Sequence, residues 1–136
     1  MTSLLYVSEA THRLPEGNDL VAAIVTVAQA RNPALEITGA LIFTGAHFAQ
    51  ILEGPEASIE ALMENIGRDE RHRGIDVVET RRISKRRFAD WSLAYAGPSL
   101  FIDRHIRPLV EKRIAGGRET IMAAQLVALM REFTQD

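Results

Sequence analysis

Apolar positions recur with two different periods along the first part of the chain. Short runs rich in leucine, valine, isoleucine and aromatic residues are typical of strands. In chain order they occupy residues 4–8, 37–43, 47–54, 75–83 and 91–97. Two longer segments carry apolar residues three and four positions apart, as amphipathic helices do. The pattern predicts the order strand, helix, strand, strand, helix, strand, strand, with a glycine turn at 44–46 that makes a hairpin.

The two predicted helices have recognisable ends. The first follows Asn18, a favourable capping residue, and ends near Arg31 because Pro33 bars its continuation. The second begins after Pro55 and stops at Gly67, since proline suits a helix start and glycine a helix end. Its apolar stripe consists of Ile59, Leu62, Met63 and Ile66.

This order of elements matches a ferredoxin-like α+β sandwich (βαββαββ), in which one mixed five-stranded sheet carries two helices on one face. Alternation along the strands makes the opposite face apolar as well, so we expect it to be covered. We expect a main unit over residues 1–97 and a C-terminal helical segment over residues 98–136 that provides this cover.

Two apolar stripes at helical spacing follow in the C-terminal segment. One lies within residues 102–110, and the other lies within residues 122–133, after the glycine pair 116–117. Because proline lacks the backbone N–H and clashes with the preceding turn, Pro108 predicts a break or kink near Arg107.

Composition narrows the class of protein. The chain has 136 residues, 46% hydrophobic and 25% charged, with a formal net charge of −2. These values are typical of a globular domain and exclude disordered and fibrous classes. No run approaches the ~20 apolar residues of a membrane span, and the first residues read as a strand rather than a signal peptide. The absence of cysteine excludes thiolate nucleophiles and cysteine metal sites, and suits a cytoplasmic protein.

The basic run 81–87 is the main charged feature. Residues 68–87 hold eight Lys/Arg against four Asp/Glu. No aromatic residues interleave the run, as binding of single-stranded nucleic acid requires, so we interpret it as a solvated strand end. The four histidines show no metal-ligand spacing. We therefore expect neither a nucleic-acid partner nor a metal.

Strand alternation gathers polar and aromatic side chains on one face of the sheet. The sets that share it are Tyr6 and Ser8; Phe48, Gln50 and Leu52; and Trp91, Leu93 and Tyr95. If this face meets the helices, a core amide lies near a phenol and an indole. A buried glutamine is unusual, because each unmet hydrogen bond costs on the order of 1–3 kcal/mol. From periodicity alone, a solvent-facing Gln50 and a Trp91 that only fills the core remain open.

Several segments together make the chain resemble the BLUF family of blue-light sensors that use flavin. In family order, from about Ser3 to Gly97, they read LLYVSEATHRL, ARNPALEITGALIF, HFAQILEGP, RDERHRGIDV and ISKRRFADWSLAYAG. The resemblance implies a flavin ring between the two helices, edge-on to the sheet, with FAD as the cofactor and FMN or riboflavin as alternatives.

The resemblance also implies roles for individual residues. Tyr6 matches the redox-active tyrosine of the family, Gln50 the switching glutamine and Asn32 the asparagine that anchors the carbonyl edge of the ring. Arg31 occupies a variable position that lines the flavin in relatives.

Four further positions match the family, of which Trp91 is the conditional one. Ser8 and Trp91 match pocket residues, and Arg71 and His72 match a basic pair near the ribityl-phosphate end. Leu93 departs from the pattern, because many relatives carry methionine there. Leucine lacks the sulfur, so a role for this side chain as a hydrogen-bond acceptor is in doubt.

The chemistry of an amide suits this role. A flavin edge mixes hydrogen-bond acceptors with one N–H donor, and an amide offers both a donor and an acceptor. Rotating or tautomerising Gln50 would therefore invert its bonds after Tyr6 has given up an electron and a proton, while Trp91 could compete as the electron donor. Without cysteine no covalent flavin adduct forms, so the signal must be stored in hydrogen bonds.

We expect a non-catalytic photoreceptor whose output reaches a partner protein or a second copy of the chain. The roughly forty residues after Gly97 are too few for an effector domain. Two alternatives remain. One is a small enzyme that binds an acyl phosphate through Arg31 and Asn32, although residues 12–18 hold one glycine where a phosphate nest usually needs several. The other is a regulatory module without flavin.

Overall fold

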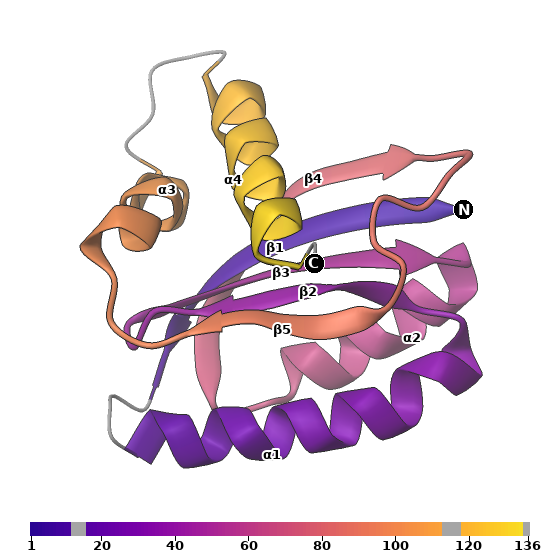
Figure 1. The fold of residues 1–136 in the computed structure, drawn as a ribbon, viewed down its shortest axis with the longest axis horizontal. Coiled ribbons are helices and arrows are strands. Elements are labelled where there is room, and N and C mark those ends of the chain that lie inside the picture. The colour runs from indigo at the N-terminus through magenta and orange to yellow at the C-terminus, as the bar shows by residue number, and fades with distance from the viewer. Residues whose placement is uncertain (12–15, 113–117, 135–136) are drawn as a thin grey trace.

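The computed structural model describes residues 1–11, 16–112 and 118–134. A five-stranded sheet lies between two pairs of helices (Figure 1). The elements are β1 (Thr2–Ala10), α1 (Glu16–Arg31), the 3-10 helix η1 (Asn32–Leu35), β2 (Thr38–Phe43), β3 (His47–Gly54), α2 (Glu56–Gly67), β4 (His72–Arg82), β5 (Trp91–Ala96), α3 (Leu100–Glu111) and α4 (Glu119–Thr134). The predicted order and the ferredoxin-like α+β architecture are confirmed.

Strand β1 lies inside the sheet, whose order is β4-β1-β3-β2-β5. β1 runs antiparallel to both β3 and β4, β2 runs antiparallel to β3, and β5 runs parallel to β2, so the sheet is mixed as predicted. Tyr6 of β1 lies directly opposite Gln50 of β3, and Leu41 of β2 flanks Gln50 on the other side. The register therefore places Gln50 in the middle of the sheet.

Helices α1 and α2 cover one face of the sheet (Figure 1). α2 begins directly after Pro55 and ends at Gly67, as its sequence predicts, and buries Ile59 and Leu62. α1 begins at Glu16, two residues before Asn18, so Asn18 lies inside the helix and the prediction that it is the cap is wrong. The acyl-phosphate alternative would need a phosphate-binding loop at residues 12–18, which hold only one glycine. This segment lies partly outside the described residues.

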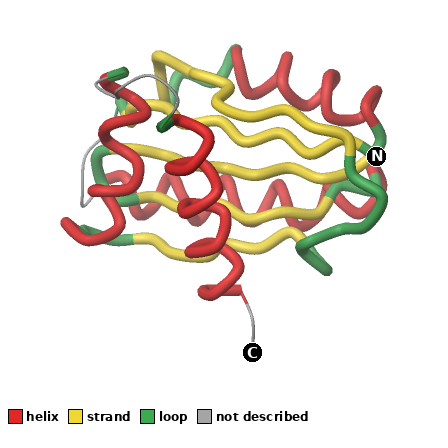
Figure 2. Tube along the Cα trace, turned by 90° about the horizontal axis from the view of Figure 1, so that it is seen from above, coloured by secondary structure: helices red, strands yellow, loops and turns green. Residues whose placement is uncertain are grey.

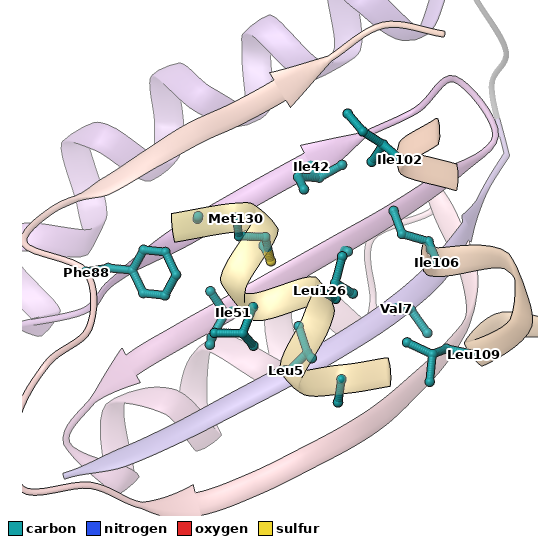
Figure 3. Packing of buried hydrophobic residues seen from close by; sticks show 14 residues of the cluster. Leu5, Val7, Ile42, Ile51, Phe88, Ile102, Ile106, Leu109, Leu126 and Met130 are labelled. Atoms are coloured by element: carbon teal, nitrogen blue, oxygen red, sulfur yellow. The ribbon is translucent and has the colours of Figure 1, made fainter. Parts of the chain in front are cut away.

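Helices α3 and α4 cover the opposite face (Figure 2). Figure 3 shows Leu126 and Met130 of α4 directed at the sheet beside Ile51, and Ile106 of α3 near Val7. All five side chains are completely buried, so this second apolar layer forms a hydrophobic core. Complete burial of one large apolar side chain stabilises the folded protein by roughly 1.5–3 kcal/mol.

The C-terminal helices also correct one prediction. α3 begins after Ser99, whose hydroxyl accepts a hydrogen bond from the amide of Ile102 at 3.1 Å, and it continues past Pro108 to Glu111. Of the break or kink predicted near Arg107, the break is absent, since the helix runs through Pro108 to Glu111. The proline lacks the N–H that would bond the carbonyl of Arg104, but only three residues of the helix follow it. The glycine pair 116–117 lies outside the described residues.

Tyr95 does not share a face with Trp91 as strand alternation predicts. Leu41 of β2 pairs with Leu93, but the next residue, Ile42, pairs with Tyr95, so β5 contains one extra residue at this point. A bulge of this kind reverses the alternation beyond it. Tyr95 consequently packs on the α4 side of the sheet, with its ring centroid 5.8 Å from that of Phe133.

The basic run has a structural use at the end of β3. Glu53 is completely buried and accepts hydrogen bonds from the backbone amides of Arg87 and Phe88 at 2.7 and 3.1 Å. The guanidinium of Arg87 donates to the same carboxylate at 3.0 Å, while Arg86 donates to the Glu53 carbonyl oxygen at 2.7 Å. These contacts hold the loop that leads into Trp91.

Gly39 allows β2 to fit between β3 and β5. Its φ is +150°, and a Cβ atom there would lie 1.9 Å from the carbonyl oxygen of Ile51. Only glycine permits this approach. Because Gly39 pairs with both Leu52 and Trp91, the close packing also sets where Trp91 enters the sheet.

Within the described parts of the chain, no helix has the length and apolar character to cross a membrane. The same residues contain no group of three or more acidic or histidine side chains placed to hold a metal ion.

Candidate functional site

A cavity of about 360 Å³ opens between α1, α2 and the sheet. It lies within the size range of small-molecule sites. Fifteen residues line it: Tyr6, Ile24, Val27, Ala28, Arg31, Leu41, Phe48, Gln50, Asn65, Ile66, Arg68, Asp69, Arg71, His72 and Trp91. The α1 side is apolar apart from Arg31, the sheet contributes both apolar and polar side chains, and the lining is charged at the end of α2. Such a site suits a flat apolar ligand with a polar or anionic tail.

Three side chains on the sheet form a hydrogen-bonded row along the cavity. Nε2 of Gln50 donates to the hydroxyl of Tyr6 at 2.6 Å, and Nε1 of Trp91 donates to Oε1 of Gln50 at 2.9 Å. The three side chains are only 3%, 7% and 7% exposed, in the order Tyr6, Gln50, Trp91. They come from β1, β3 and β5, so the sheet alone brings them together.

The row defines the direction of the Gln50 amide. An indole N–H only donates, so the amide atom that faces Trp91 must be the oxygen. The amide nitrogen then faces Tyr6, whose hydroxyl oxygen accepts. The phenolic proton of Tyr6 is left to bond elsewhere, and the cavity is the space beside it.

Burial raises the pKa of Tyr6 well above its usual range. The hydrogen bond from Gln50 and the charge of Arg31 act in the opposite direction, while the charge of Asp69 adds to the increase. Tyr6 is therefore a neutral phenol at neutral pH, with its proton in place.

Asn32 carries an unpartnered donor in the interior. The residue is 0% exposed, and its Oδ1 accepts a hydrogen bond from Nε of Arg31 at 3.1 Å. Its Nδ2 has no partner. An unpaired buried donor costs about 1–3 kcal/mol, so the position is suited to a ligand acceptor such as a carbonyl oxygen. Asn32 begins η1 directly after Arg31, which lines the cavity.

His72 joins the end of α2 to β1. Its Nε2 lies 2.8 Å from the carbonyl oxygen of Ile66, and its Nδ1 lies 2.8 Å from the hydroxyl of Ser8. A carbonyl oxygen only accepts, so Nε2 carries the hydrogen and a neutral His72 accepts from Ser8 at Nδ1. Both ring nitrogens are occupied, and His72 meets the cavity with its ring rather than with a free hydrogen-bonding atom.

The mouth of the cavity carries an ion pair. Arg71 donates to both carboxylate oxygens of Asp69, with Nε 2.8 and 3.0 Å from them. Burial alone would raise the pKa of Asp69, but the hydrogen bonds and charge of Arg71 outweigh it and lower that pKa. Partial burial lowers the pKa of Arg31. With Arg68, the cavity lining contains three arginines and one carboxylate.

Six of the nine residues predicted for the site line the cavity: Tyr6, Arg31, Gln50, Arg71, His72 and Trp91. Ser8 and Asn32 are buried and do not line the cavity, and Leu93 packs with the core under the helices. The sequence did not single out the polar group Asn65, Arg68 and Asp69. These residues lie where the apolar stripe of α2 ends, and no spacing marks which of them faces inward.

Residues 1–94 match the family described as "Sensors of blue-light using FAD". The photoactivated adenylate cyclase subunit beta of Euglena longa is 36% identical over 97 residues, which cover 71% of this chain and 11% of that protein. The blue light- and temperature-regulated antirepressor BluF of Escherichia coli K12 is 36% identical over 90 residues, which cover 62% of this chain and 22% of that protein. The chain thus spans only about a tenth to a fifth of these relatives.

Solved structures agree with this match over more of the chain. The dark-state structure of the BLUF protein BlrB is 29% identical and has a TM-score of 0.71. The match covers 93% of this chain and 94% of the BlrB chain. The photo-activated state of BlsA is similar in fold, with a TM-score of 0.72 and 24% identity over 93% of this chain. The chain accordingly belongs to the BLUF family, the flavin-binding sensors of blue light.

Proposed function

We propose that Tyr6 and Gln50 carry the light reaction of this sensor, with FAD held non-covalently in the cavity between α1 and α2. The observation that carries the proposal is the Gln50 amide, which is held between the phenol of Tyr6 and the indole of Trp91 at the cavity wall. A neutral group with both a donor and an acceptor can reverse its bonds without moving charge.

The cavity supplies complementary contacts for each part of such a cofactor. Asn32 does not itself line the cavity, but it directly follows Arg31, which does, and its unpartnered Nδ2 would suit a carbonyl oxygen of the ring. Val27 stays 55% exposed although it lines the cavity, and a bound ring would cover it. The arginines Arg31, Arg68 and Arg71 favour a phosphate-bearing tail, hence FAD or FMN over riboflavin.

The chain's own residues account for the chemistry around the cofactor. When bound, the flavin supplies the absorption of blue light and, once excited, accepts an electron. Tyr6 would be the residue that gives up that electron and then passes its phenolic proton to the reduced ring, and both would return to Tyr6 afterwards. During this cycle the hydrogen bond from Gln50 to the Tyr6 hydroxyl, which is 2.6 Å long in the structure, would be broken and remade with Tyr6 as the donor.

Trp91 restricts what the reversed arrangement can be. If the amide of Gln50 simply rotated, its NH₂ group would face the N–H of Trp91, and two donors would oppose each other. The reversed state therefore requires either that Trp91 withdraws or that Gln50 becomes the imidic tautomer, whose nitrogen accepts a hydrogen bond.

We further propose that residues 1–97 form the sensing unit and that residues 98–136 carry the output. Apolar side chains stay exposed on both C-terminal helices: Leu100, Phe101, Ile121 and Phe133. Their exposure suits contact with a partner protein or with a second copy of this chain.

A visible spectrum of the purified protein in the dark and under blue light tests the proposal. We expect a yellow protein whose absorption shifts to the red under blue light and returns in the dark, and a pigment whose mass is that of FAD. A colourless protein that does not take up added FAD would overturn the proposal. So would a flavin-loaded protein whose absorption does not shift.

A further inference from the structure

A buried polar cluster ties the hairpin of β2 and β3 to helix α3. Nδ1 of His47 lies 2.7 Å from Oδ1 of Asp103, and the hydroxyl of Thr44 donates to the same oxygen at 2.9 Å. The other carboxylate oxygen, Oδ2, lies 2.9 Å from a guanidinium nitrogen of Arg107, one turn along α3. Asp103 is 6% exposed, so its charge is satisfied by these donors rather than by water.

The cluster joins the strand of Gln50 to the C-terminal helices. His47 is the first residue of β3 and Gln50 is the fourth. Alternation along the strand directs Gln50 toward α1 and α2, and His47 toward α3. Asp103 lies beyond residues 1–94, the part of the chain that matches the BLUF family. The contact therefore joins the part of the chain that matches the family model to the C-terminal segment that follows it.

The remaining contacts between the C-terminal helices and the sheet are apolar. Ile102, Ile106 and Leu109 of α3 pack in the core cluster, as do Leu126 and Met130 of α4. Within the described residues, no hydrogen bond or ion pair joins an α4 side chain to the sheet. Apolar packing has no preferred direction, whereas a hydrogen bond weakens steeply with distance and angle. A small displacement of β3 would thus change the energy of α3 mainly through Asp103.

We propose that the contact between His47 and Asp103 is the positioning contact that couples the state of β3 to helix α3. The proposal rests on the proposed function, because it needs a light-induced rearrangement of Gln50. In the dark arrangement the cluster holds α3 against the hairpin. When Gln50 reverses its bonds and β3 shifts, the hydrogen bonds to Asp103 lengthen and α3 loosens, while α4 follows through its apolar contacts.

Hydrogen–deuterium exchange of α3 in the dark and under blue light tests this coupling, with the visible spectrum recorded on the same samples. In the unchanged protein, we expect illumination to speed exchange within residues 100–111 several-fold. In His47→Phe the carboxylate keeps Thr44 and Arg107 as donors, so the helix stays in place. We expect this variant to show the red shift but a much smaller light-dependent difference in α3, because only Thr44 still links the hairpin to Asp103.

A matched control separates coupling from mere loss of helix stability. Ser99→Ala removes the capping bond to the Ile102 amide and leaves the cluster intact. We expect faster exchange of α3 in both states of this variant, with the light-dependent difference retained. If His47→Phe fails to fold, the double variant His47→Phe/Asp103→Leu removes the buried charge together with its partner, which folded proteins tolerate better than an unpaired charge.

The two proposals fail in different ways. A normal red shift with no light-dependent change in α3 of the unchanged protein would overturn the coupling and leave the proposed function standing. The same holds if either variant at His47 keeps the full light-dependent difference. Absence of the red shift from the unchanged protein would overturn both.

Discussion

The indole N–H of Trp91 lies 2.9 Å from Oε1 of Gln50, and this contact determines which end of the amide faces Tyr6. The two residues are 41 positions apart and come from β3 and β5, which do not pair with each other. Strand β2 lies between them, and the glycine at position 39 lets it pack closely enough. The direction of the central amide thus depends on three strands at once.

Replacing Tyr6 with phenylalanine should abolish the light-induced red shift while flavin stays bound, because the electron and proton donor is lost. It should also destabilise the flavin-free protein by about 1–3 kcal/mol, since Nε2 of Gln50 loses its buried acceptor. The shift is measured by visible absorption and the stability by urea unfolding. Tyr95→Phe is the control: the Tyr95 hydroxyl bonds the Pro98 carbonyl away from the cavity, so this variant should keep the shift. A normal photocycle in Tyr6→Phe would show that the donor is another residue.

Trp91→Phe removes the donor that holds Oε1 of Gln50. One hydrogen bond contributes about 1 kcal/mol, which is roughly a fivefold ratio between the two amide orientations. We expect the flavin-loaded variant to populate both orientations in the dark, so its dark absorption maximum moves toward the lit one and the saturated light-minus-dark difference becomes smaller. An unchanged dark spectrum with an unchanged difference would mean that Trp91 does not control the amide.

Asn32→Leu separates ligand binding from folding. The variant removes the buried Nδ2, which has no partner in the protein, but also the bond that Oδ1 accepts from Arg31, so the two effects oppose each other and the stability of the flavin-free protein should change by no more than about 1 kcal/mol. If this amide bonds a carbonyl of the ring, FAD affinity should fall about tenfold to a hundredfold. Titration with FAD, followed by flavin fluorescence, measures the affinity. Undiminished affinity would remove Asn32 from the site.

The Asp103 carboxylate should make stability depend on pH on the acid side. Its burial alone would raise the pKa, but hydrogen bonds from His47 and Thr44, together with nearby positive charge, outweigh the burial and lower it. The unfolded chain then binds the proton first as pH falls, so the contribution of Asp103 is complete above about pH 4 and is lost as pH falls through the folded-state pKa.

Asp103→Asn tests this dependence. At neutral pH the variant should be less stable than the unchanged protein, and the difference should shrink as pH falls below about 4. Urea unfolding of the flavin-free proteins at several pH values measures both curves. A constant difference across the acid range would show that the charge of Asp103 contributes nothing in this pH window.

Much of the fold could be predicted because its signals are local. β3 and α2 have the ends that their turn residues predict, and a two-residue period places Tyr6 and Gln50 on the same face of neighbouring strands. That period fails where pairing is irregular. Tyr95 changes face because β5 gains a residue relative to β2, and no pattern within β5 itself records this.

The sequence by itself determined the order of elements, the two apolar faces of the sheet and the family, since each depends on residues close together in the chain or on motifs in order. The tertiary structure decided the rest: which way the Gln50 amide points, which polar residues at the end of α2 face the cavity, and that Asp103 is buried against His47. The physical reason is that hydrogen bonds require their partners within about 3 Å. The partners in these contacts lie in separate elements, so only their packing brings them that close.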